Sequence, residues 1–330
     1  MKIKLKNIVT SNVLELCNQL QELNYSDEYL FDISNVNTYE PFSMLLASRA
    51  LKKFSLKGNK CSIVNSDNNP NYKYAAHMGF FKSFDCNLGN EPGEAVGSTS
   101  YLPITKICFD DLDFKDSPIR QEAIEKKSKE IAVVLSQSNI ELTEILTYLL
   151  REIIRNVYEH SRTNIVWICA QYWWNKDLAE IAILDEGIGI WESLNSNVYH
   201  KNYLNSNLEA LKWSLKPGIS GVFSPNKKPK NHDIWTNSGY GLYIVKNLCT
   251  KFGGWFVMVS NGDCVRCYAD GKNQEIKTNF EGTAISLRIK PSKITNVKET
   301  IMELNVNGEK EAQNIRNAFK ESSIPSKGLL

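Results

Sequence analysis

The segment 140–160 constrains the fold more than any other, because it joins an apolar helical stripe to polar residues in a fixed register. Its apolar residues have the three-and-four spacing of a buried helix face: Leu142, Ile145, Leu146, Leu149, Leu150, Ile153, Ile154 and Val157. Glu152, Asn156 and His160 recur at every fourth position, so a helix places them on one line about 6 Å apart. Alone, such a line is more typical of a solvated stripe than of a site.

Three later motifs place glycines at the boundaries of expected elements. Asp185-Glu-Gly187-Ile-Gly189 follows an apolar, strand-like run at 181–184. Ser238-Gly239-Tyr240-Gly241-Leu242 opens an amphipathic helix that ends near Phe252. Gly282-Thr283 precedes an alternating strand at 284–289. The chain therefore presents four motifs in a defined order.

This order, Glu-x-x-x-Asn, Asp-x-Gly-x-Gly, Gly-x-Gly-Leu and Gly-Thr, resembles the ATP-binding domain shared by DNA gyrase B subunits, related heat-shock chaperones, sensor histidine kinases and mismatch-repair ATPases. The resemblance covers about residues 138–290. It implies the Bergerat fold, an α/β class in which a two-layer sandwich has a mixed sheet with helices on one face. The implied ligands are ATP and Mg²⁺.

The resemblance also implies a role for each motif. Asp185 would accept a hydrogen bond from the exocyclic amine of adenine. Gly187 and Gly189 would let the backbone approach the base, and Thr283 would hold the same edge through water. The helix start at Gly239, Tyr240, Gly241 and Leu242 would bind phosphate.

Asn156 would be the protein ligand of magnesium, which commonly takes one oxygen from protein and the rest from phosphates and water. Glu152 would then polarise a water, or a substrate hydroxyl, for attack on the γ-phosphorus. We expect an ATPase whose hydrolysis drives a conformational or assembly switch. An anti-sigma-type protein serine/threonine kinase and a non-hydrolysing ATP-sensing module remain alternatives. An autophosphorylating histidine kinase is disfavoured, because no histidine lies between His77 and His160.

Strands and helices alternate in residues 1–112, which predicts a small α/β regulatory or docking domain. We expect a helix at 11–23, a strand at 29–33, a helix from Pro41, a strand at 61–64, a helix at 72–81 and a closing strand at 102–109. The arrangement is weakly similar to anti-sigma-antagonist domains of the sulfate-transporter type. A protein partner or a homodimer would bind through this domain.

The ATP-binding domain is expected at 118–290, with a lid at about 191–237. Lys227, Lys228 and Lys230 in that lid either reach phosphate or form a solvated basic loop. Arg151 and Arg155 are expected on a surface stripe. Residues 291–330 should form a helical extension, with helices near 297–304 and 312–319, followed by a loose tail.

Composition bounds the remaining functions. The net charge of +2 is too small to indicate nucleic-acid binding, and no apolar run has the length that crosses a bilayer. The start of the chain lacks the apolar core of a secretory signal, which favours the cytoplasm. Eight cysteines lie mostly in apolar runs, as expected of reduced, buried thiols. Cys264 and Cys267 form the only close pair, and a structural role is favoured over a zinc site.

Overall fold

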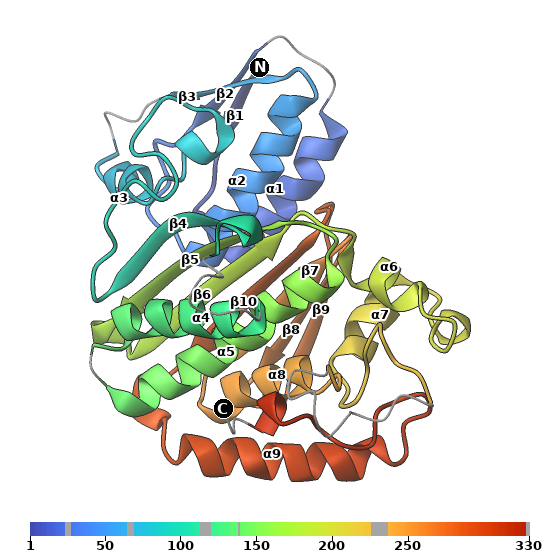
Figure 1. The fold of residues 1–330 in the computed structure, drawn as a ribbon. Coiled ribbons are helices and arrows are strands. Elements are labelled where there is room, and N and C mark those ends of the chain that lie inside the picture. The colour runs from blue at the N-terminus through green and yellow to red at the C-terminus, as the bar shows by residue number, and fades with distance from the viewer. Residues whose placement is uncertain (24–27, 65–68, 113–119, 138, 226–236, 328–330) are drawn as a thin grey trace.

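The computed structural model describes residues 1–23, 28–64, 69–112, 120–137, 139–225 and 237–327. It has an α/β architecture with a three-stranded parallel sheet and a seven-stranded antiparallel sheet (Figure 1). The α/β class expected from the sequence is therefore confirmed. None of the described helices combines the length and apolar composition that crossing a bilayer requires.

The amino-terminal unit alternates strands and helices as expected. Its elements are β1 (Lys2–Lys4), α1 (Thr10–Glu22), β2 (Glu28–Asp32), α2 (Pro41–Leu56), β3 (Lys60–Val64) and α3 (Tyr72–His77). The strands pair in parallel in the order β1-β2-β3. Pro41 begins α2, where a missing backbone N–H costs no helical hydrogen bond. β1 was not expected because three residues carry too little pattern, and α3 ends earlier than expected, before Gly79 with φ of 80°.

The large sheet has the order β4-β5-β6-β10-β7-β8-β9. Its strands are β4 (Tyr101–Cys108), β5 (Ile165–Trp173), β6 (Leu178–Asp185), β7 (Trp255–Ser260), β8 (Asp263–Tyr268), β9 (Asn273–Lys277) and β10 (Thr283–Ile289). Every neighbouring pair is antiparallel, so the expected mixed sheet is wrong. The reason is local, since tight turns such as Asn261-Gly262, with φ of 41° and 96°, join consecutive strands.

Two findings differ from the separate amino-terminal domain that was expected at 1–112. The strand that was expected to close it is β4, which pairs instead with β5 at the edge of the large sheet. The unit also shares a hydrophobic core with one face of that sheet, through contacts of α2 with β5, β6 and β10. Residues of both parts occur in this core: Phe31, Phe42, Met44, Cys169, Ala182 and Val257.

The opposite face of the large sheet is covered by helices α4 (Arg120–Ser136), α5 (Ile140–His160) and α8 (Gly241–Lys251), with α9 (Val297–Ala312) packed outside them (Figure 1). Asn139 caps α5, because its side-chain oxygen accepts from the Leu142 N–H at 2.9 Å. Helices thus cover both faces of the sheet, whereas helices on only one face were expected.

The segments around the expected lid and tail are more ordered than the sequence indicated. Short helices α6 (Gly189–Asn195) and α7 (Asn207–Ser214) lie between 189 and 225, while Lys227, Lys228 and Lys230 lie outside the described residues. Helix α9 extends to Ala312, and residues 313–319 form turns instead of the expected second helix. The expected loose tail is wrong for residues 322–327, because Ser322, Ser323 and Ser326 are buried there.

Candidate functional site

One pocket is lined by residues from α5, the end of β6, the start of α8, β10 and the carboxyl-terminal segment. It contains about 930 Å³ of empty space, part of it open to solvent. The expected site residues that line it are Glu152, Asn156, Asp185, Gly189, Gly239, Gly241, Leu242 and Thr283. Gly187 and Tyr240 are not among the lining residues. Residues of all four motifs therefore meet at one pocket.

Helix α5 runs along this pocket and defines its two ends. At one end the Ser161 carbonyl accepts a hydrogen bond from the Ile188 N–H at 2.9 Å, next to Asp185. At the other end Glu152 lies against Gly241, at the start of α8. Ser161 lies nine positions after Glu152, which corresponds to about 13 Å along the helix axis. The pocket is thus elongated, with Asp185 and Glu152 at opposite ends.

Asp185 is a buried carboxylate at the end of β6. It lies opposite Thr283 in the sheet, and its Oδ1 accepts from the Gly187 N–H at 2.9 Å. Burial raises the pKa of Asp185 to about 7, although the Gly187 hydrogen bond opposes the shift and the neighbouring Glu186 adds to it. The carboxyl group thus changes charge near neutral pH, and a hydrogen-bond donor from a ligand would favour its ionised form.

Gly187 has a different role from the one expected. A Cβ at this position would lie 2.1 Å from the Ser161 carbonyl oxygen, so glycine is needed where the Asp185 motif packs on the end of α5. Gly189, by contrast, lines the pocket and has φ of 79°. Gly187 thus shapes the site by backbone packing, without lining the pocket.

A Gly187→Ala substitution should destabilise the protein by about 3 kcal/mol, because two backbone segments would have to separate. Urea unfolding measures the loss. Gly271→Ala is the matched control, since it has φ of 81° with no atom within 4 Å of an added Cβ, and it should cost only about 1 kcal/mol of backbone strain. Equal losses for the two variants would contradict the tight packing at Gly187.

Glu152 is buried beside a buried arginine. Its Oε1 accepts from Nε and Nη2 of Arg151 at 3.2 and 3.1 Å, and Arg151 also reaches Glu125 of α4 at 3.2 Å. The expected surface stripe of Arg151 and Arg155 is therefore wrong, since both residues are only 3–4% exposed. The second Glu152 oxygen faces Gly241, where an added Cβ would lie 2.4 Å from it. Arg151 thus orients the carboxylate toward the start of α8.

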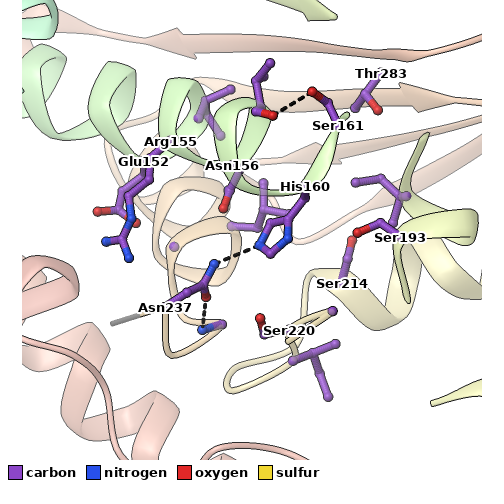
Figure 2. Close-up of a pocket in the computed structure, with 18 of the residues that line it drawn as sticks. Glu152, Arg155, Asn156, His160, Ser161, Ser193, Ser214, Ser220, Asn237 and Thr283 are labelled. Atoms are coloured by element: carbon purple, nitrogen blue, oxygen red, sulfur yellow. Dashed lines mark hydrogen bonds between the residues drawn. The ribbon is translucent and has the colours of Figure 1, made fainter. Parts of the chain in front are cut away.

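Asn156 projects from α5 into the pocket, one turn after Glu152 (Figure 2). Its carboxamide makes no hydrogen bond to any described residue, although the side chain is half-buried. An amide oxygen without a hydrogen-bond partner can serve as a ligand for a hard cation that takes most of its other ligands from phosphate and water. Among the residues that the structure covers, no cluster of three or more His, Cys, Asp or Glu side chains forms a metal site.

Asn237 is a site residue that the sequence did not indicate. Its Oδ1 accepts from the Gly239 N–H at 2.8 Å, and its Nδ2 contacts His160 Nε2 at 2.8 Å (Figure 2). The same Nδ2 donates to Glu159 at 2.7 Å. The Gly239 bond fixes the orientation of the amide, so His160 Nε2 must be the acceptor and its ring is neutral. Burial is the main cause of a lowered pKa for His160, which agrees with a neutral ring.

The Asn237 contacts join the end of α5 to the glycine loop before α8. Glu159 is itself held by Arg155 Nε at 2.6 Å. The position of Asn237 directly before Ser238-Gly239 was the available sequence signal. His160, to which the sequence assigned no role, therefore anchors this loop.

Serine residues line much of the remaining wall, and the sequence gave no signal for them apart from Ser238, which begins the Gly-x-Gly-Leu motif. The residues are Ser193, Ser214, Ser220, Ser238, Ser323 and Ser326. Tyr240, expected to bind the ligand, is fully buried outside the pocket and donates its hydroxyl to the Phe319 carbonyl at 3.1 Å. The carboxyl-terminal segment, which no motif marked, is thus part of the site.

The Cys264 and Cys267 pair lies apart from this pocket. Both thiols are free and buried in β8, and the two residues belong to the cores on opposite faces of the sheet. They cannot bind one metal ion together, which supports the structural role expected for them. Neither the protein-family models nor the curated proteins with which the sequence was compared match this chain.

Proposed function

We propose that this pocket binds ATP with Mg²⁺ and hydrolyses the nucleotide. The observation that supports the proposal most directly is the position of Asp185 and Glu152 at opposite ends of one elongated pocket. Asp185 and Thr283 lie side by side at one end, where a buried carboxylate can accept from the exocyclic amine of adenine. An adenosine triphosphate has a length comparable to the distance along α5 between these ends.

The Glu152 end suits the phosphates. Gly241 and Leu242 begin α8, where backbone N–H groups without helical partners favour phosphate oxygens, while Asn237 Oδ1 holds the Gly239 N–H in the preceding loop. Asn156 would hold Mg²⁺, which would neutralise charge on the phosphates. Glu152 would take a proton from the attacking water, while Arg151 keeps its carboxylate in position.

The amino-terminal unit contacts residues next to the Asp185 end of the pocket. Arg49 of α2 lies 3.7 Å from Glu186, which follows Asp185, and Lys53 of α2 lies 2.6 Å from Glu281, close before Thr283. Helix α2 therefore contacts both strands that would hold the adenine. We propose that changes at this end of the pocket reach a protein partner, or a second copy of the chain, through the amino-terminal unit.

A Glu152→Gln variant tests the proposal. The carboxamide keeps the size of the side chain but cannot take a proton, so Mg-ATP binding should persist while release of free phosphate falls by at least about 100-fold. Calorimetry measures binding and a phosphate assay measures turnover. Glu299→Gln, which changes an exposed carboxylate on α9, is the control and should retain both. Absence of ATP binding by the wild-type protein would refute the proposed function.

A further inference from the structure

Several hydrogen bonds hold the carboxyl-terminal segment 318–327 beside the pocket. The Phe319 N–H donates to the Gly218 carbonyl at 2.8 Å, and the Ser326 carbonyl accepts from the Tyr148 hydroxyl and from Asn305 Nδ2, each at 2.9 Å. These bonds fix the path of the segment from both sides of Ser323. Its position beside the pocket is thus set by the fold.

This segment lies at the Glu152 end of the pocket. Tyr148, which holds Ser326, is one helical turn before Glu152 on α5. The Ser323 N–H donates to Ser238 Oγ at 2.9 Å, and Ser238 directly precedes Gly239 of the phosphate-binding helix start. A serine hydroxyl of the same chain therefore stands where the γ-phosphate of the proposed ligand would end.

We propose that Ser323 accepts the γ-phosphoryl group of ATP bound in its own chain, which makes the protein a self-phosphorylating serine kinase. The inference rests on the ATP binding proposed above. Ser323 Oγ forms a bond to the γ-phosphorus, and the bond from that phosphorus to the β–γ bridging oxygen breaks. ADP leaves with the bond's electron pair, and the serine proton passes to the Glu152 carboxylate and then to solvent.

The contacts of the neighbouring serines single out Ser323. Ser322 does not line the pocket, and its Oγ donates to Glu309 at 2.7 Å. Ser326 Oγ reaches the glycine loop only through Ser323, at 3.1 Å. Ser323 Oγ accepts directly from Ser238 Oγ at 3.1 Å, which leaves an oxygen lone pair and a defined orientation beside the loop.

Phosphorylation would also change the site. A phosphoserine carries a charge of about −1.5 to −2 at neutral pH and would stand where the triphosphate binds. The modified chain should therefore bind Mg-ATP less tightly than the unmodified chain. Such a reaction would limit itself to one phosphate per chain.

The full-length protein incubated with γ-labelled ATP and Mg²⁺ tests this inference. Label should appear on the chain at a rate independent of protein concentration, and peptide mass spectrometry should place it on Ser323. Ser323→Ala should reduce the label to background, whereas Ser323→Thr, which keeps a hydroxyl group, should carry phosphothreonine. Glu152→Gln should bind ATP and remain unlabelled.

Calorimetry on the same preparations separates the two proposals. If ATP binds and free phosphate appears while the chain stays unlabelled, self-phosphorylation is refuted and the ATPase remains. Label on Ser326 or at any other position would also overturn the assignment to Ser323. Absence of ATP binding would refute both proposals.

Discussion

Replacing Asp185 with asparagine should weaken adenine nucleotide binding by on the order of 100-fold. One Asp185 oxygen accepts from the Gly187 N–H at 2.9 Å, which leaves the other for the exocyclic amine of the base. Asparagine has a single acceptor oxygen. If that oxygen stays on Gly187, the NH₂ group faces the amine, and two donors oppose each other. Calorimetry with Mg-ATP measures the loss.

The same substitution should stabilise the unliganded protein at alkaline pH. Burial raises the pKa of Asp185 from 3.8 to about 7, so the folded protein holds a proton between these values that the unfolded chain has lost. Stability contributed by this group therefore falls as pH rises through that window, by about 4 kcal/mol in total. Asp185→Asn removes this dependence, and its advantage should grow by about 3 kcal/mol between pH 5 and pH 8.

Urea unfolding at pH 5, 6.5 and 8 measures this advantage, with Glu299→Gln as an exposed control that should follow the wild type. The affinity for Mg-ATP should also depend on pH. Wild-type affinity should fall about tenfold per pH unit below 7, relative to Asp185→Asn at the same pH, because the ligand amine needs the ionised carboxylate. A constant affinity ratio would contradict the assignment of adenine to Asp185.

Replacing Arg288 with methionine should destabilise the protein by about 3–5 kcal/mol at pH 8. Arg288 is buried in β10 and lies 2.9 Å from Glu180 of β6 and 2.6 Å from Glu40, next to the start of α2. Without the guanidinium group, Glu180 would remain as a buried charge. Burial raises the pKa of Glu180, with Arg288 opposing the rise, so the variant can take up a proton and should lose less stability at pH 5.5.

Two further variants show whether the buried charge causes the loss. The double variant Arg288→Met/Glu180→Gln should recover much of the stability, because a carboxamide oxygen still accepts from Ser286 Oγ, now 3.0 Å from Glu180. Lys251→Met removes an exposed pair with Glu303 and should cost less than about 1 kcal/mol. If the double variant unfolds as easily as Arg288→Met, the uncompensated charge is not the cause.

Local pattern was sufficient to predict most elements and several of the residues that line the pocket. The apolar spacing of 140–160 correctly predicted α5, and the alternating pattern at 284–289 correctly predicted β10. Glu152, Asn156 and Asp185, which line the pocket, were indicated by local motifs: the first two by their four-residue spacing on one helix, and Asp185 by its position at the end of a strand. Such information is contained in neighbouring residues and needs no knowledge of the fold.

Expectations that depended on contacts between distant segments were less reliable. Arg151 and Arg155 look like a surface stripe in sequence, yet both are buried, and Arg151 pairs with Glu125 of α4. The strand at 102–109 looks like part of the amino-terminal unit, yet it pairs with β5. In each case a partner far along the chain decides the environment, and periodicity carries no information about that partner.

By itself, the sequence determined the longer helices and strands and the short motifs that carry carboxylate, amide and glycine groups, because these features depend on neighbours a few positions away. The tertiary structure alone decided that Asn237 and His160 hold the glycine loop, and that Ser323 borders the pocket beside Ser238. Those contacts join residues about 80 positions apart. Packing of the whole chain selects them, and no local pattern encodes them.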